Sequence, residues 1–357
     1  MRIVVTGASG NVGTALLRRL TRLGVHDVVG VVRRPPRPVG VYEHVRWHSI
    51  DLAADDAAAQ LRPVFDGADA VVHLAWGFQP TRNVDYLHRV GVGGTTAVLD
   101  AADATSVGQL LHMSSVGTYA AGRYGQRIDE SWPTSGIPSS PYSRHKSEAE
   151  AVLDEYESDR GEGGVPIARM RPGFIVQRAA ASGLMRYALP GFLPTLAVPL
   201  LPVLPVDRAL CIPLVHADDV AAAVLSAVER KATGAFNLAA DPPLTRDGVA
   251  KVMHAKPIHI PSGLLGTLVD LSWRTRVQPI DRGWLDMAFT VPLLNCARAR
   301  AELDWRPQWS SMAALSDVLT GVAQQAYAES PPLRRRSMLE QLRRDLTDGQ
   351  LTTRHLP

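Results

Sequence analysis

The sequence predicts a doubly wound α/β fold, in which helices cover both faces of a parallel β-sheet. Two observations support this prediction: short apolar runs alternate with longer helical segments through the first half of the chain, and a glycine-rich turn joins the first run to the first helix. Strands buried on both faces of a parallel sheet are typically such continuous apolar runs. The predicted strands are Ile3–Thr6, Val28–Val32, Val45–His48, Ala70–Leu74, Gln109–Ser114 and Ile167–Arg171.

The glycine-rich turn opens the helix predicted over Asn11–Leu23. Its glycines let backbone N–H groups approach a phosphate closely, and the start of a helix favours negative charge. The turn therefore predicts a dinucleotide site. Its glycine spacing differs from the Gly-x-Gly-x-x-Gly pattern, so a tight turn without a ligand is the alternative. The candidate binding residues are Thr6, Gly7, Gly10, Asn11, Val12 and Gly13.

Arg33 and Arg34 follow the second predicted strand, where folds of this class select their dinucleotide. An acidic residue there would bind the ribose 2′-hydroxyl of NAD, whereas an arginine pair suits the 2′-phosphate of NADP. We therefore expect NADP, with NAD as the alternative if the arginines only face solvent. Asp51 and Leu52 follow the third strand and could contact the adenine, although Asp51 could instead cap the next helix.

Further helices are predicted over Val84–Ala104 and Pro141–Glu157, the second bounded by capping serines and by the glycines after it. Tyr142 and Lys146 lie four residues apart on this helix and therefore share a face. A positive charge beside a phenol stabilises its phenolate, which suits the pair to acid–base chemistry. Ser115 follows the fifth predicted strand, at the sheet edge where ligands bind, and could donate a hydrogen bond to a substrate oxygen.

After the sixth strand the alternation fades into proline-rich and tryptophan-containing segments, with short strands predicted again at Ile212–Val215 and Ala235–Leu238. We expect a Rossmann-type dinucleotide-binding domain at residues 1–173, with returns near 211–238. A smaller, interleaved substrate lobe is expected at residues 174–210 and 239–329, with the tryptophans from Trp273 to Trp309 in its core. Residues 330–357 are predicted to form a basic terminal helix or tail.

The composition is that of an ordinary globular protein, with 357 residues, 46% hydrophobic residues and a formal net charge of +3. This charge is too small to indicate nucleic-acid binding. Cys211 and Cys296 match no metal or redox spacing, and the histidines match no metal pattern, so we expect no metal and a reducing, cytoplasmic environment. Five prolines interrupt the apolar stretch Ala188–Val206, which argues against a membrane span.

Taken together, these motifs resemble the extended short-chain dehydrogenase/reductase family, which includes nucleotide-sugar epimerases, dehydratases and carbonyl reductases. The resemblance covers nearly the whole chain. It implies that Leu74, Ala75 and Trp76 border the cofactor and that Pro172 and Gly173 lie beside the nicotinamide. One residue departs from the family pattern, because Gly91 stands where an asparagine usually supports the active-site lysine and its water. The motifs are Thr6–Gly13, His73–Trp76, Ser115 with Tyr119, Tyr142 with Lys146, Arg171–Gly173, Val215–Ala221, Phe236–Leu238 and Leu303–Pro307.

The resemblance implies hydride transfer at the nicotinamide, with Tyr142 exchanging the substrate proton, Lys146 lowering the pKa of Tyr142 and binding the ribose, and Ser115 polarising the carbonyl. The predicted pocket wall at Leu184–Leu210 is apolar, with Arg186 and Arg208 as its cations, which favours a small hydrophobic carbonyl or alcohol. A nucleotide-sugar epimerase or dehydratase and a non-catalytic NADP-sensing protein are the alternatives. The resemblance also implies a homodimer formed through paired helices.

Overall fold

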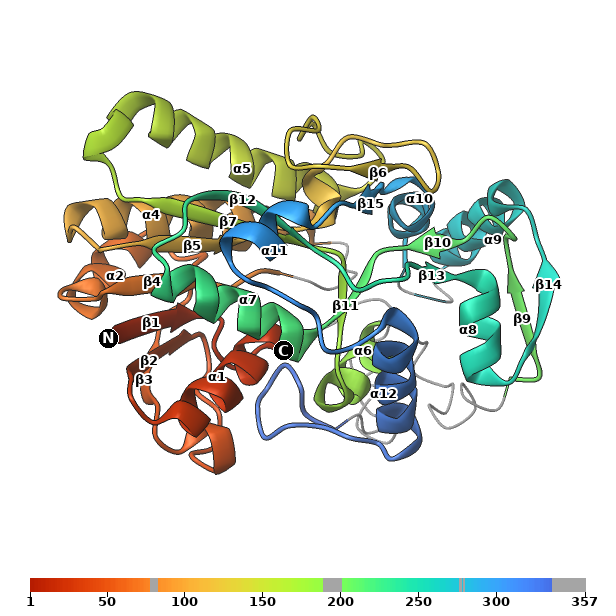
Figure 1. Cartoon of the computed structure of the whole chain (residues 1–357), viewed down its shortest axis with the longest axis horizontal. Coiled ribbons are helices and arrows are strands. Elements are labelled where there is room, and N and C mark those ends of the chain that lie inside the picture. The colour runs from red at the N-terminus through yellow and green to blue at the C-terminus, as the bar shows by residue number, and fades with distance from the viewer. Residues whose placement is uncertain (78–82, 189–200, 276–277, 279, 336–357) are drawn as a thin grey trace.

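A seven-stranded parallel sheet forms the centre of the computed structural model, which describes residues 1–77, 83–188, 201–275, 278 and 280–335. The strand order is β12-β7-β5-β4-β1-β2-β3, and every neighbouring pair is parallel. Figure 1 shows this sheet on the side of the N-terminus and the smaller lobe on the other side. The doubly wound fold is therefore confirmed. Its strands are β1 (Arg2–Thr6), β2 (Asp27–Val32), β3 (Arg46–Ser49), β4 (Ala70–His73), β5 (Leu110–Met113), β7 (Ile167–Pro172) and β12 (Gly234–Leu238).

Helices cover both faces of the sheet, and a separate apolar core fills the space on each side. One core contains side chains of α1 and α7, and the other contains side chains of α2, α4 and α5. Burying apolar surface stabilises the folded state by roughly 25 cal/mol per Å². This favours mostly apolar side chains on both faces of the strands. These helices are α1 (Asn11–Leu23), α2 (Ala57–Phe65), α4 (Gly94–Ala104), α5 (Pro141–Arg160) and α7 (Ala217–Glu229).

The second lobe is built from short helices and strands, most of which follow β7 in the chain. Its two-stranded pairs are β8 with β11, β9 with β14 and β10 with β13, and a fourth pair, β6 with β15, borders the sheet. The strands are β6 (Arg127–Ile128), β8 (Phe174–Val176), β9 (Val203–Val206), β10 (Cys211–Ile212), β11 (Leu214–His216), β13 (Leu244–Thr245), β14 (Lys256–His259) and β15 (Leu293–Leu294). The helices are α6 (Ala181–Ala188), α8 (Arg246–Met253), α9 (Ser262–Arg274), α10 (Arg282–Thr290), α11 (Ala297–Glu302) and α12 (Ser311–Ala323).

Two predicted elements are interrupted in the structure. The helix predicted over Val84–Ala104 consists of α3 (Val84–His88), a π-helical turn at Arg89–Gly93 and α4. The strand predicted over Ile212–Val215 is divided between β10 and β11 at Pro213, which has no N–H to donate to a sheet.

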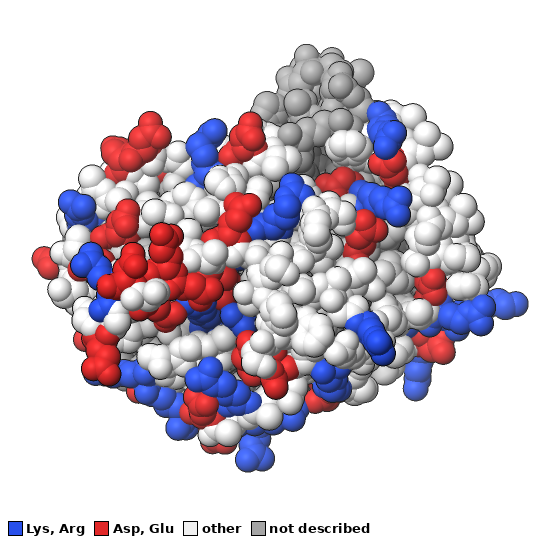
Figure 2. All heavy atoms as spheres, turned by 90° about the horizontal axis from the view of Figure 1, so that it is seen from above, with Lys and Arg blue, Asp and Glu red and all other residues white. Residues whose placement is uncertain are grey.

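The surface differs between the two parts of the molecule. Figure 2 shows acidic side chains gathered toward the side on which α5 lies, and a largely uncharged surface over the second lobe. Of the helices in the described ranges, none is both long and apolar enough to cross a membrane. The centre of the apolar stretch, residues 189–200, and the tail, residues 336–357, lie outside the described residues.

Candidate active site

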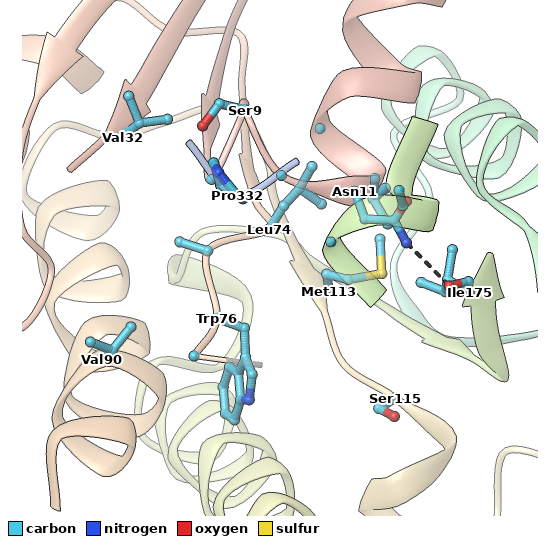
Figure 3. Close-up of a pocket in the computed structure, with 18 of the residues that line it drawn as sticks. Ser9, Asn11, Val32, Leu74, Trp76, Val90, Met113, Ser115, Ile175 and Pro332 are labelled. Atoms are coloured by element: carbon cyan, nitrogen blue, oxygen red, sulfur yellow. Dashed lines mark hydrogen bonds between the residues drawn. The ribbon is translucent and has the colours of Figure 1, made fainter. Parts of the chain in front are cut away.

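A cavity of about 440 Å³ lies at the carboxyl edge of the sheet. Figure 3 shows Ser9 and Val32 toward one end of this cavity and Ser115 at the opposite end. All of the predicted site residues except Thr6 line it. They are Gly7, Gly10, Asn11, Val12, Gly13, Arg33, Arg34, Asp51, Leu52, Leu74, Ala75, Trp76, Ser115, Tyr142, Lys146, Pro172 and Gly173.

Thr6 does not reach the cavity, because it is fully buried at the end of β1. Its hydroxyl lies 2.7 Å from Nδ1 of His73, whose Nε2 lies 3.2 Å from the hydroxyl of Thr95. Burial and, to a smaller extent, the positive charge of Lys146 lower the pKa of His73 to about 3, so this ring is neutral. Thr6 and His73 therefore support the glycine-rich turn from behind the cavity wall.

The glycine-rich turn approaches the end of β4 closely. Gly7 has φ +68°, and a Cβ atom there would lie 2.6 Å from the backbone nitrogen of Ala75, so only glycine fits. No side chain caps the first N–H groups of α1, whose first residues border the cavity. The side chain of Asn11 is held by β8 and the residue after it: its Nδ2 donates to the carbonyl of Ile175, and its Oδ1 accepts from Gln177 (Figure 3).

Arg33 and Arg34 border the same end of the cavity as the glycine-rich turn. Nη1 of Arg33 donates to the hydroxyl of Tyr86 at 2.6 Å, and Tyr86 is itself a lining residue that the sequence did not indicate. Asp51 accepts a hydrogen bond from the backbone of Ala53, so it closes a local turn and does not cap α2, which is preceded by Asp56.

Ser115 and Tyr142 meet at the other end of the cavity. Burial raises the pKa of Tyr142 to about 12, and a hydrogen bond from Ser115 partly opposes that rise. Oγ of Ser115 also accepts from the backbone N–H of Gly117 at 3.0 Å, which fixes the orientation of the serine. The hydroxyl of Tyr119 is bound by Asn237 and Arg171 inside the core, so Tyr119 is a structural residue.

Lys146 is buried, with Nζ donating to the carbonyl of Met113 at 2.7 Å and lying 3.4 Å from the centre of the Trp76 ring. Burial lowers the pKa of its ammonium group well below the ordinary value, and the charge of Glu150 partly opposes that shift. Burial dominates at Tyr142 and raises the pKa of the phenol, so the expected lowering by Lys146 stays a prediction.

Trp76 and Trp284 flank Tyr142. Their ring centroids lie 6.3 Å and 5.3 Å from that of Tyr142, respectively. The sequence predicts Trp284 in the core of the second lobe. No sequence pattern around it indicates that it packs against Tyr142. Phe174, Leu184 and Met287 add apolar side chains to this end of the cavity.

The family model for NAD-dependent epimerases and dehydratases matches residues 3–239. The chain belongs to this family. The match includes all of the predicted site residues, and the epimerase/dehydratase family has the fold described above.

Individual relatives of this chain share low sequence identity with it. An uncharacterized protein of Mycobacterium tuberculosis is 26% identical over 90% of this chain, but the chain spans only 30% of that protein's length. A ketoreductase of Stigmatella aurantiaca that acts on a farnesylated dihydroquinoline oxide is 30% identical over 49% of this chain and 50% of its own. UDP-glucose 4-epimerase of Thermus thermophilus, solved with NAD, has a TM-score of 0.66 at 19% identity, with 90% of this chain and 99% of the other covered. At that identity the solved structure indicates the fold alone.

Proposed function

We propose that this chain is an NADP-dependent oxidoreductase that transfers a hydride between nicotinamide and a small, fairly hydrophobic carbonyl or alcohol. The observation that carries the proposal is the single cavity shared by two sets of residues. The glycine-rich turn and an arginine pair lie at one end, and Ser115, Tyr142 and Lys146 lie at the other.

The residues at the first end fit a dinucleotide. The uncapped start of α1 offers backbone N–H groups and a positive dipole to a pyrophosphate. Arg33 and Arg34 offer guanidinium groups that match a 2′-phosphate, and Asp51 and Leu52 border the space for an adenine. Leu74, Ala75, Pro172 and Gly173 would then lie along the cofactor toward Tyr142. When bound, NADPH supplies the two electrons of the reduction as a hydride.

Tyr142 moves the proton of the reaction. Because its pKa is raised to about 12, its hydroxyl is protonated at neutral pH and can donate to a carbonyl oxygen as negative charge develops there. Ser115 donates a second hydrogen bond to that oxygen and so stabilises the same charge. Lys146 would hold the nicotinamide ribose and, when protonated, would stabilise the phenolate that remains after Tyr142 has donated its proton; a proton from solvent then restores the phenol.

The reaction end of the cavity favours an apolar substrate. Of the lining residues in the described part of the chain, the cations are Arg33, Arg34 and Lys146. The two arginines directly follow Val32, which lies toward the same end of the cavity as Ser9 (Figure 3). A nucleotide-sugar diphosphate needs cationic partners at the reaction end, whereas Trp76, Phe174 and Met287 suit a hydrophobic carbonyl. The relative that reduces a farnesylated ketone supports this preference.

Calorimetric titration with NADP and NAD tests the cofactor. We expect NADP to bind more tightly. We expect the double change Arg33→Gln and Arg34→Gln to weaken NADP by about tenfold or more, because a charged hydrogen bond contributes about 1.5–3 kcal/mol, and to leave NAD almost unchanged. Arg19→Gln, an exposed arginine on α1, is the matched control. Tighter binding of NAD than of NADP would contradict the assignment.

The epimerase alternative rests on the family match, since the family includes epimerases and dehydratases. An enzyme of that kind retains its nicotinamide and shows no net cofactor turnover. The homodimer and the cytoplasmic location inferred from the sequence stay predictions.

A further inference from the structure

The chain turns back toward the glycine-rich turn after α12. We call residues 328–334 of this return the C-terminal strap. Backbone bonds fix its shape: Ala328 N–H donates to the carbonyl of Leu333, and Leu333 N–H donates to that of Ser330. Just before the strap, the carbonyl of Ala326 accepts from the N–H of Ser182 in α6. The strap is therefore an ordered part of the fold.

The strap contacts the turn that is proposed to bind the pyrophosphate. Oγ of Ser330 donates to the carbonyl of Ser9 at 2.8 Å, and the serine is 2% exposed. Pro331, Pro332 and Leu333 line the cavity, and Leu333 is buried. Figure 3 shows Pro332 beside Ser9 at the end of the cavity away from Ser115. The strap therefore forms a wall of the cavity, which stays open with the strap in this position.

The strap also brings charge to this end. Glu329 pairs with Arg37 at 3.9 Å, and Arg334 comes directly after the lining residue Leu333. Burial, with the positive charges of Arg33 and Arg334, lowers the pKa of Arg34, so these three guanidinium groups act on one another. Clustered guanidinium groups raise the positive potential at the rim of the cavity, which favours an anion there.

We propose that the C-terminal strap completes the adenosine end of the cofactor site, with Ser330 fixing it to the glycine-rich turn and Arg334 adding a third guanidinium group for the 2′-phosphate. The proposal rests on the proposed function and deepens it. It assigns cofactor binding to a segment about 300 residues along the chain from the turn that it contacts.

The test compares two neighbouring arginines in the full chain. Arg334→Gln removes the charge at the cavity end. Arg335→Gln is the matched control, because Arg335 is exposed and donates to Gln325 beside α12. Binding of NADPH and NADH is measured by fluorescence titration for both variants and the wild type. We expect Arg334→Gln to weaken NADPH about tenfold, equivalent to about 1.4 kcal/mol, and to change NADH less than about twofold. Arg335→Gln should change neither.

A second variant tests the attachment of the strap independently of charge. Ser330→Ala removes the bond to Ser9, so both cofactors should dissociate several times faster in stopped-flow displacement. The proposal would be overturned if Arg334→Gln and Arg335→Gln had equal effects on cofactor binding. It would also be overturned if dissociation were unchanged in Ser330→Ala, or if any of these variants bound the cofactor more tightly. A wild type that prefers NADH would overturn the proposed NADP dependence instead. A preference that depends on Arg33 and Arg34 but not on Arg334 would refute only the role of the strap.

Discussion

At the scale of single residues, the departure at Gly91 has a structural explanation. A Cβ atom at Gly91 would lie 2.9 Å from the indole carbons of Trp76. The same indole covers Nζ of Lys146. The sequence left open whether a water or another side chain takes the place of the usual asparagine; in this structure the Trp76 indole packs there.

Gly91→Ala should destabilise the protein. The added methyl group forces the indole to move, at about 1–3 kcal/mol, and this exceeds the gain of up to about 1 kcal/mol from replacing a helical glycine. Gly93→Ala is the control, because a Cβ atom at Gly93 meets nothing within 4 Å. Urea unfolding should show a lower midpoint for the first variant only, and Trp76→Leu should remove the difference. A Gly91→Ala variant as stable as Gly93→Ala would disprove the close contact.

At the scale of elements, a buried ion pair fixes α5 against β7. Both oxygens of Glu150, one turn after Lys146, accept hydrogen bonds from Arg171, at 2.8 and 2.6 Å, and one of them also accepts from Arg169 at 3.1 Å. Burial opposes ionisation of Glu150, but the hydrogen bonds and charge of Arg171 outweigh it and lower the pKa of the carboxyl. This contact sets the position from which α5 presents Tyr142 and Lys146 to the cavity.

Glu150→Gln should cost about 3–5 kcal/mol, because it leaves the buried guanidinium group of Arg171 without its compensating charge. Arg169 keeps its ion pairs with Asp154 and Glu157. Glu155→Gln, an exposed residue on the same helix, should cost less than about 0.5 kcal/mol. Because the folded pKa of Glu150 is lowered, its stabilisation is present above the ordinary carboxyl pKa and is lost as the pH falls through the folded value. Urea unfolding at pH 7 and at a series of pH values from 4 down to 2 should therefore show a smaller acid-induced loss in Glu150→Gln than in the wild type. An equal loss would contradict this role.

Elements with a strong local pattern could be predicted from the sequence. Strands such as β4 and β5 are continuous apolar runs, and α5 carries a capping serine and a terminal glycine. The π-helical turn at Arg89–Gly93 could not be predicted, because no local pattern marks it; its Gly91 lies against Trp76, which is outside the helix. Trp284 and Tyr86 were missed for a related reason: their residue types indicate a core, and only the fold brings them to the cavity.

At the scale of the whole molecule, the cavity joins segments from the whole length of the chain. The sheet edge supplies the cofactor end, α10 and α6 supply apolar side chains, and the C-terminal strap closes one wall. Sequence patterns identified the cofactor end at the sheet edge because each of its motifs is a short, continuous run of residues. The strap lacked any such pattern, since its bond to Ser9 links residues at opposite ends of the chain. The basic helix predicted for the tail falls largely on residues 336–357, outside the described part.

The proposed reaction is net hydride transfer from NADPH to a carbonyl. The most direct measurement incubates the protein with NADPH carrying deuterium at C4 and a panel of hydrophobic ketones and aldehydes, and follows both cofactor and product by mass spectrometry. We expect one NADPH oxidised per alcohol formed, deuterium on the carbinol carbon, and a rate at least about 100-fold lower in Tyr142→Phe, which lacks the donating hydroxyl. Interconversion of nucleotide-sugar epimers without net NADPH consumption, or full activity in Tyr142→Phe, would contradict it.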